Sequence, residues 1–276
     1  MPKAILIYEH GGPEVLKWEH TEVGDPGDGE VRLKLKAAGL NFIDCYQRSG
    51  LYPIDLPQTL GVEGVGVIDA IGPNVDNLSI GQRVAYSGGQ IGSYAEARLI
   101  SASALIPVPD KIDDQTAAAM MLKGMTVHML LFKCYMVQPG DTILVHAAAG
   151  GVGNIMCQWA NYLGVTVIGT VGSEEKAEKA KTDGCHHAIN YSTENFTDRV
   201  KEITDGKGVP VVYDSVGKET FQGSLDCLQT FGSLVTFGNA SGPVPAVEPL
   251  VLMQKGSVTL CRPTLMHYTA DHDRRD

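Results

Sequence analysis

The stretch "HAAAGGVGN", residues 146–154, decides the fold of this chain. It follows the apolar run "TILVH" and leads directly into "IMCQWANYLG", whose apolar residues have helical spacing. A glycine-rich turn between a buried strand and a helix is a common phosphate-binding element of parallel α/β sheets. The stretch therefore predicts a phosphate-binding turn. The alternative is a tight strand-to-helix turn that holds no ligand.

The sequence around this stretch alternates between strand-like and amphipathic segments. Helical spacing behind an acidic start predicts a helix over residues 113–132. Further helices are expected over residues 153–164, 173–184, 193–206 and 218–232. Strands are expected at residues 142–146, 165–170, 187–190, 210–215, 233–238 and 257–261. Strand and helix repeated in this way predict a doubly wound parallel sheet that is covered on both faces.

The first part of the chain has a different sequence pattern. From Lys3 to about Val108 the segments are short and rich in Val, Ile, Leu and Tyr. They are broken by "GGPEV", "GDPGDGE", "IGPNV" and "SGGQIGS". Short apolar segments separated by Gly- and Pro-containing turns are typical of antiparallel strands. We therefore expect this half to be all-β and the chain as a whole to be α/β.

Composition narrows the classes of function. The 276 residues carry a formal charge of −10 without a cluster of Lys and Arg, which argues against a nucleic-acid or anionic-membrane partner. No uninterrupted apolar segment approaches the roughly 18 residues of a membrane span. The six cysteines lie far apart with no CxxC pair, and the N-terminus has no signal-peptide pattern. We expect a cytoplasmic, reduced protein.

The central turn approximates the dinucleotide fingerprint. Its pattern is Ala148-x-Gly150-Gly151-x-Gly153, with Ala148 where the first glycine usually stands. Gly150 and Gly151 let the backbone approach a pyrophosphate, and Gly153 lets the helix pack closely on the strand. In this setting we favour nucleotide binding over an empty turn.

The end of the second strand indicates which nucleotide binds. A protein that prefers NAD usually carries Asp or Glu there, whereas this strand runs into Val171, Gly172 and Ser173. Ser173 can donate to a 2′-phosphate and Lys176 can neutralise it, which predicts NADPH. In the alternative interpretation, Ser173 is only a helix cap and Lys176 belongs to a solvated first turn.

Several segments together resemble a known family. They are "EHGGPEVL", "NFIDCYQRSGLYP", "LGVEGVGVIDAIG", "MLKGMTVHMLL", "HAAAGGVG", "YDSVG" and "TFGNASG". In this order and spacing they resemble the zeta-crystallin-type quinone oxidoreductases, the zinc-lacking branch of the medium-chain dehydrogenases/reductases. The resemblance implies a GroES-like catalytic domain over residues 1–123 and a Rossmann dinucleotide-binding domain over residues 124–263. Residues 264–276 would begin the segment that returns to the catalytic domain. The given chain ends about fifty residues before the point where its relatives would end.

The resemblance also implies roles for individual residues. Asn41, Tyr46 and Tyr52 match positions that line the nicotinamide and quinone pocket. Lys123 and Thr126 match the "KGxT" segment at the domain junction. The pyrophosphate would meet Gly150, Gly151 and Val152. The 2′-phosphate side would be Ser173, Lys176 and Tyr191. The ribose and nicotinamide would meet Ser215, Phe237, Gly238 and Asn239.

The reaction expected from the resemblance needs no metal. Zinc-containing members have a His before the Glu of "GVEG" and a lobe of four cysteines, but here Val62 takes the His position and the lobe is missing. Adjacent His186 and His187 cannot chelate one ion from a strand. Hydride transfer from NADPH to a quinone fits, with Tyr or Asn donors steadying the developing oxyanion.

Two other functions stay open at this point. A reductase of 2-alkenals or enones would use the same cofactor geometry with a different pocket. The chain could also bind NADPH without turnover if the polypeptide were truncated. The resemblance further implies a homodimer. We expect it to form through the edge strand near Ser257–Cys261, because an exposed edge of β-branched residues needs a partner.

Overall fold

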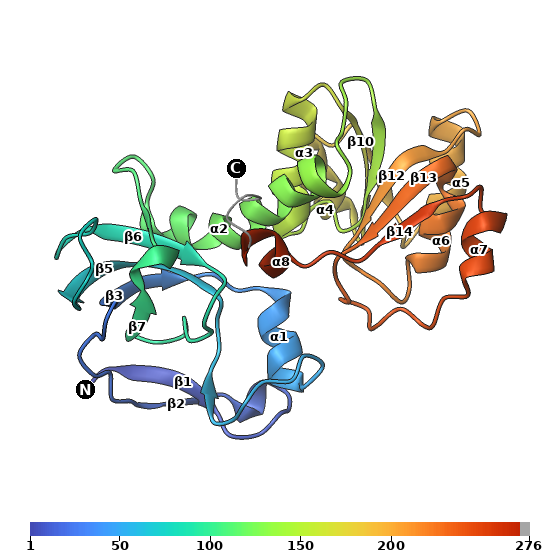
Figure 1. Ribbon diagram of the computed structural model, residues 1–276. Helices are drawn as coiled ribbons and strands as arrows, with labels where there is room; N and C mark the ends of the chain where they lie inside the picture. Colours follow the sequence, from blue (N-terminus) through green and yellow to red (C-terminus); the bar gives the residue numbers. More distant parts are fainter. Residues whose placement is uncertain (271–276) are drawn as a thin grey trace. The chain divides into compact units, whose positions relative to one another are not determined.

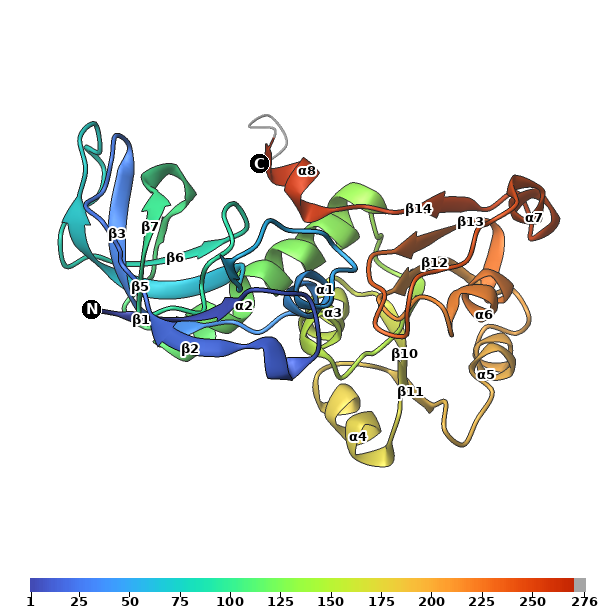
Figure 2. The same cartoon turned by 90° about the horizontal axis from the view of Figure 1, so that it is seen from below.

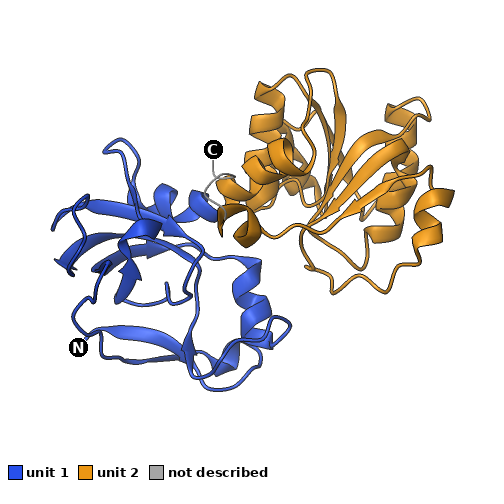
Figure 3. Cartoon of the chain, in the orientation of Figure 1, with its two compact units in different colours: residues 1–122 blue, residues 123–276 orange. Residues whose placement is uncertain are grey.

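The computed structural model describes residues 1–270, and the chain forms two compact units (Figure 3). The first unit ends at Leu122 and the second begins at Lys123. Of the segment 264–276, the structure describes helix α8 (Leu265–Ala270), which belongs to the second unit. Residues 271–276 lie outside the described residues.

The second unit is built on a parallel sheet in the order β11-β10-β9-β12-β13-β14 (Figure 1). Its strands are β9 (Thr142–Val145), β10 (Thr166–Val171), β11 (His187–Asn190), β12 (Val209–Asp214), β13 (Leu228–Thr236) and β14 (Thr259–Cys261). The chain starts at β9, runs outward to β11, and returns to the other side of β9 with β12. The carboxyl end of β9 therefore lies at the point where the strand order reverses, which is where doubly wound sheets bind ligands.

Helices cover both faces of this sheet. They are α3 (Gly151–Tyr162), α4 (Glu174–Thr182), α5 (Phe196–Ile203) and α6 (Phe221–Asp226). In β9, Ile143 and Val145 pack in one apolar core with residues of α3 and α4, and Leu144 packs in the other with residues of α5 and α6. Successive strand residues thus point to opposite faces. Figures 1 and 2 show the strands lying between the two helix pairs.

The sequence prediction was wrong at the end of the fifth expected helix. The expected helix over residues 218–232 is limited to α6, and β13 already begins at Leu228. Leu228 pairs with Val209 of β12, and Phe231 has a φ of +63°, which a helix does not tolerate. The short helix α7 (Pro249–Gln254) was not predicted, because six residues give too little periodicity to recognise.

One long helix was predicted correctly. Helix α2 (Asp114–His128) continues as the π-helical segment η3 (Met129–Cys134). Among the described residues, this continuous helix is long and apolar enough to cross a membrane by length and composition alone. The core helices of soluble proteins meet the same criterion, so it assigns no membrane.

The first unit consists of antiparallel strands in two sheets. One sheet has the order β2-β1-β4, from β1 (Lys3–Ile7), β2 (Lys17–His20) and β4 (Gln58–Thr59). The other has the order β7-β3-β5-β6-β8, from β3 (Glu30–Ala38), β5 (Glu63–Ile71), β6 (Arg83–Ser87), β7 (Ala97–Ser101) and β8 (Ile106–Pro107). Two 3-10 turns, η1 (Pro13–Val15) and η2 (Ala102–Ala104), lie between strands.

The expectation that this half is all-β was incomplete. Helix α1 (Phe42–Ser49) interrupts it, capped by Asn41 at its start and by Gly50 in the left-handed conformation at its end. The backbone N–H of Asn41 donates to Oδ2 of Asp44 at 2.8 Å, as in a capping box.

Candidate functional site

The turn after β9 has the geometry that the fingerprint predicts. Ala148 is fully buried, Gly150 caps α3 in extended conformation, and Gly151 is the first helical residue. A Cβ at Gly153 would lie 2.3 Å from the carbonyl oxygen of Ala147, so only glycine allows the helix to approach the strand this closely. Val152 packs partly against the core. The free N–H groups of the twelve-residue helix α3 therefore begin at a glycine.

Lys123 lies beside this turn. A Cβ at Gly151 would come within 2.7 Å of Lys123 Cε, so the lysine stem passes directly over the glycine. Lys123 and the half-buried Thr126 are both on α2, one turn apart. The structure thus brings Lys123, predicted from the resemblance alone, next to the predicted phosphate-binding turn.

A second polar corner forms at the end of β10. Ser173 caps α4, and its Oγ accepts a hydrogen bond from the backbone N–H of Lys176 at 3.3 Å. Tyr191 is half exposed, and a Cβ at Gly172 would lie 2.6 Å from its hydroxyl oxygen. The three predicted residues Ser173, Lys176 and Tyr191 therefore lie around Gly172. The capping role of Ser173 that we kept as an alternative is also present.

Two acidic residues, Glu174 and Glu175, begin α4 at this corner and are exposed. Glu174 Oε1 accepts from the amide of Asn190 at 2.7 Å, which draws this carboxylate toward β11. Glu174 keeps its negative charge, because Asn190 is a neutral donor.

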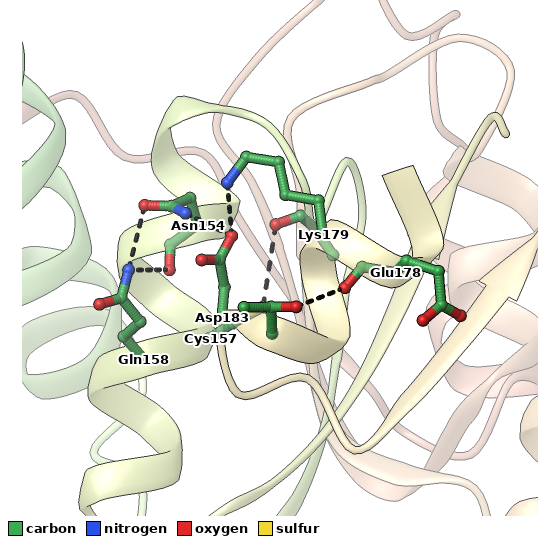
Figure 4. Close-up of polar contacts among 8 residues, drawn as sticks. Asn154, Cys157, Gln158, Glu178, Lys179 and Asp183 are labelled. Carbon is green, nitrogen blue, oxygen red and sulfur yellow. Dashed lines mark hydrogen bonds and ion pairs between the residues drawn. The ribbon is translucent and has the colours of Figure 1, made fainter. Parts of the chain in front are cut away.

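A polar cluster joins α3 to the end of α4 (Figure 4). The carboxylate of Asp183 accepts from the amide of Asn154 and, at 2.6 Å, from Lys179 Nζ. Gln158 donates to Oδ1 of Asn154 at 3.1 Å. Asn154 is in the first turns of α3, so the cluster ties the helix of the central turn to the helix that begins at Ser173.

The residues predicted for ribose and nicotinamide lie together after β12 and β13. A Cβ at Gly238 would lie 2.3 Å from the carbonyl oxygen of Ser215, and the N–H of Phe237 donates to Asp214 O at 2.8 Å. Arg262, which the sequence analysis missed, donates from Nη1 to Gly238 O at 3.2 Å. When the Asn239 side-chain amide is oriented so that its nitrogen and its oxygen both have partners, the oxygen accepts from Arg262 Nη2 at 3.0 Å.

Three predicted residues belong to the first unit. Tyr46 lies on α1 and packs edge-on against Tyr52, with ring centroids 5.2 Å apart. Asn41 donates from Nδ2 to Glu63 Oε1 at 2.8 Å. Glu63 was missed as a site residue because a single Glu at the start of a strand gives no motif of its own.

A half-buried tyrosine and a buried carboxylate lie next to Asn41. Tyr94 donates to Oδ2 of the buried Asp44 at 2.6 Å. Burial, followed by this hydrogen bond, raises the pKa of Tyr94. Asp44 accepts from both Tyr94 and the Asn41 backbone, so it fixes the start of α1.

A buried polar network under the central turn was also missed. Nδ1 of His146 lies 2.8 Å from Thr170 Oγ1, and its Nε2 lies 2.9 Å from Ser224 Oγ. Ser224 donates onward to the fully buried carboxylate of Asp214 at 3.0 Å. Burial lowers the pKa of His146, which Asp214 raises to a lesser extent. The network links β9, β10, β12 and α6.

The described residues include no group of three or more His, Cys, Asp and Glu side chains that could hold a metal ion.

Comparisons with known proteins agree with this geometry. Residues 27–110 match the family described as alcohol dehydrogenase GroES-like domain, and residues 151–270 match the family described as zinc-binding dehydrogenase. A quinone oxidoreductase of Pseudomonas aeruginosa is 52% identical over 269 residues, which cover 97% of this chain and 83% of the relative.

A second relative and a solved structure extend the comparison. A 2-haloacrylate reductase of a Burkholderia species is 47% identical over 285 aligned residues, covering 100% of this chain and 85% of the relative. The structure of Escherichia coli quinone oxidoreductase complexed with NADPH superposes with a TM-score of 0.96 at 46% identity. It covers 99% of this chain and 84% of that one.

The chain belongs to the quinone oxidoreductase family of the medium-chain dehydrogenases/reductases. This confirms the family inferred from the sequence motifs. It also confirms the fold class, a GroES-like domain with a Rossmann-type parallel sheet. Membership in a family described as zinc-binding does not supply zinc ligands here, because Val62 stands before Glu63.

Proposed function

We propose that this chain reduces quinones with a hydride taken from NADPH. The observation that carries the proposal is a glycine turn at the start of α3 together with Ser173, Lys176 and Tyr191 beside a β10 end that has no acidic residue. The Escherichia coli relative with the same fold was solved with NADPH bound. The relatives from that organism and from Pseudomonas aeruginosa carry the name quinone oxidoreductase.

The residues present fit NADPH at both phosphate ends. The first turn of α3, which begins at Gly151, offers backbone donors to a pyrophosphate, and the Lys123 stem lies over Gly151. Ser173, Lys176 and Tyr191 offer hydroxyl and ammonium groups to a 2′-phosphate. Gly238 and Asn239 would contact the ribose and nicotinamide end, and Arg262 forms hydrogen bonds with both residues.

When bound, NADPH supplies the hydride, and the chain supplies orientation. Tyr46 and Tyr52 present aromatic faces and hydroxyl groups to a planar acceptor such as a quinone. Their hydroxyls can steady negative charge that develops on a quinone oxygen. From the family resemblance we assign Asn41, Tyr46, Tyr52, Lys123 and Thr126 to the reaction site.

We further propose that no metal takes part. The argument is chemical, because an electrophilic quinone needs no Lewis acid to accept a hydride and the position before Glu63 holds Val62. We also propose a cytoplasmic location, which fits six cysteines that form no disulfide.

A reductase of activated alkenes is the second candidate, favoured by the 47% identical 2-haloacrylate reductase. Turnover of NADPH with a benzoquinone, a 2-alkenal and 2-chloroacrylate separates the two functions. We expect the largest kcat/KM with the quinone. A larger value with either alkene would reassign the substrate, and NADPH binding without turnover of any acceptor would leave only the binding function.

We also propose a homodimer through β14. In the described chain this strand lies at the edge of the sheet, where it pairs with β13 on one side. The backbone groups of Thr259–Cys261 on the other side can pair with a strand of a second copy. Val258 is buried just before this strand and its N–H donates to Leu252 O at 3.0 Å, so Val258→Pro would break that bond and disturb the start of the edge strand. Light scattering should report a dimer for the unmutated chain and a weaker one for this variant. A monomer at micromolar concentration would contradict the proposal.

A further inference from the structure

Two buried thiols lie beneath the central turn, and the proposed reaction uses neither of them. Cys157 is on α3 and is fully buried, and Cys185 is in the turn between α4 and β11, where it is 4% exposed. Both belong to the apolar core between these helices and the sheet. A hydrogen bond links the two thiols, so they form a pair rather than two separate cysteines.

The two chain segments that carry these thiols are in direct contact. A Cβ at Gly184 would lie 3.1 Å from the carbonyl oxygen of Cys157, so the glycine lets this turn approach α3 closely. At the surface, a hydrogen bond from the amide of Asn154 to the carboxylate of Asp183 joins the same two segments (Figure 4). Thiols that touch on adjoining segments can be bridged with little movement of the backbone.

The pair also contacts the central turn itself. The Sγ of Cys157, one helical turn after Gly153, lies 3.8 Å from the carbonyl oxygen of Ala148. A Cβ at Gly169 of β10 would lie 2.5 Å from Ala148 Cβ and 2.7 Å from Cys185 Sγ. These two side chains therefore fill the space over the glycine from both sides. A core packed this closely transmits a movement of Cys185 to Ala148.

The hydrogen bond between the thiols gives them different chemistry. It lowers the pKa of Cys185 and, together with burial, raises the pKa of Cys157. Cys185 is therefore the thiol that ionises, and Cys157 stays protonated as its donor. The thiolate is the form that reacts with oxidants. Cys185 also lies next to the exposed His186, which places it one residue from the surface.

We propose that Cys157 and Cys185 are an oxidation site that forms a reversible disulfide, with hydrogen peroxide as the oxidant. The Cys185 thiolate attacks one peroxide oxygen, the O–O bond breaks, and hydroxide leaves, which gives a sulfenic acid. The Cys157 sulfur then attacks the Cys185 sulfur, and the sulfenic oxygen leaves as water with the Cys157 proton. The hydroxide takes the proton that Cys185 released on ionising. Two thiols are oxidised to one disulfide, and one peroxide is reduced to two waters.

The disulfide changes the packing under the central turn. Bonded sulfur atoms lie closer together than hydrogen-bonded ones, so the bond draws the turn at Gly184 toward α3 and displaces Ala148. The backbone donors of α3 begin three residues later, at Gly151. Resting on the proposed function, we expect the oxidised chain to bind NADPH at least tenfold more weakly. Bound NADPH should in turn slow the oxidation, because such coupling is reciprocal.

Peptide mapping of the full chain tests whether the bond forms. The chain is treated with hydrogen peroxide, its remaining thiols are alkylated, and it is digested with chymotrypsin, which cleaves after Tyr135 and so separates Cys134 from Cys157. We expect a linked pair of peptides that contain Cys157 and Cys185, lighter by two hydrogens than the two free peptides together and released by dithiothreitol. A peroxide-treated chain without this link would overturn the proposal.

Cys185→Ala tests the effect on the central turn, and Cys227→Ala is the matched control. Cys227 is as buried as Cys157 but packs in the other core, with residues of α5 and α6. Backbone hydrogen exchange over residues 148–154 and NADPH affinity are measured before and after peroxide. We expect both to change in the unmutated chain and in Cys227→Ala, with recovery in dithiothreitol, and neither to change in Cys185→Ala. Cys185→Ala keeps every methionine, so methionine oxidation does not account for the difference.

The hydrogen-exchange readout needs no nucleotide, which keeps this test separate from the proposed function. A chain that forms the link and changes its exchange supports the inference even when it does not bind NADPH, a result that counts against the proposed function alone. Unchanged exchange in the linked chain, or the same change in Cys185→Ala, would overturn the inference. If Cys185→Ala does not fold, Cys157→Ala removes the other half of the pair and takes its place.

Discussion

At the scale of single residues, selectivity for the nucleotide depends on what stands after β10. Gly172 leaves space for the Tyr191 hydroxyl, and the end of β10 at Val171, Gly172 and Ser173 has no acidic residue that would select NAD. Glu174 is held by Asn190. The corner therefore offers hydrogen-bond donors and one positive charge to a 2′-phosphate.

Lys176→Ala should weaken NADPH binding roughly tenfold or more, because a hydrogen bond between charged groups is lost at a partly exposed site. NADH, which has no 2′-phosphate, should bind with unchanged affinity. Calorimetric titration of both nucleotides measures the difference. Lys181→Ala, on the last turn of the same helix and paired with Glu178, is the control and should leave both affinities unchanged. Equal affinities for NADPH and NADH in the unmutated chain would contradict the NADPH assignment.

At the scale of elements, His146 connects parts of the sheet that form the central turn. The single hydrogen of Ser224 is directed to Asp214 or to the carbonyl of Thr220, so Ser224 accepts from His146 Nε2. Burial lowers the pKa of His146 and so favours the neutral imidazole, in which Nδ1 accepts from Thr170 Oγ1.

The stability of the second unit should therefore depend on pH in one direction. Burial lowers the pKa of His146 in the folded state, so the unfolded chain binds the proton first as the pH decreases. The contribution of His146 is complete above about pH 6.5 and is lost progressively below it. The melting temperature should fall between about pH 7.5 and pH 5.5, and His146→Asn should flatten this dependence.

His187→Asn serves as the control, because His187 is exposed and should not alter the pH dependence. An unchanged slope in His146→Asn would show that the network does not carry the effect.

Much of the second unit could be predicted because its strands are continuous apolar runs with helices between them. "TILVH" and "HAIN" became β9 and β11, since buried parallel strands need this composition. Helix α1 could have been found from Asn41 and Asp44, whose spacing is that of a capping box. It was missed because the flanking segments have strand-like patterns. The shortening of α6 could not be read from periodicity, because pairing of Leu228 with Val209 overrides local preference.

The candidate site was predicted unevenly for a physical reason. Gly150, Gly151 and Ser173 follow from local sequence, because turns and caps depend on neighbouring residues. Other site residues form hydrogen bonds with distant parts of the chain: Glu63 with Asn41, Arg262 with Gly238, and Ser224 with His146. These partners are 22 to 78 positions apart. Only the folded arrangement brings such partners together.

At the scale of the whole molecule, the proposed reaction needs residues from both units. Asn41, Tyr46 and Tyr52 belong to the first, whereas Lys123 and the nucleotide-binding residues belong to the second. The family places both kinds of domain in one chain, matched here over residues 27–110 and 151–270. Neither unit alone carries every residue that the proposed function uses.

The most direct test of the central claim is the stoichiometry of hydride transfer by the full chain. NADPH oxidation and hydroquinone formation are followed together, without and with exhaustive chelation by EDTA. We predict one hydroquinone formed for each NADPH consumed, a slower rate with NADPH deuterated at the transferred position, and no effect of EDTA. Loss of turnover on chelation that zinc restores would contradict the metal-free account, and NADPH consumption without hydroquinone would contradict the proposed reaction itself.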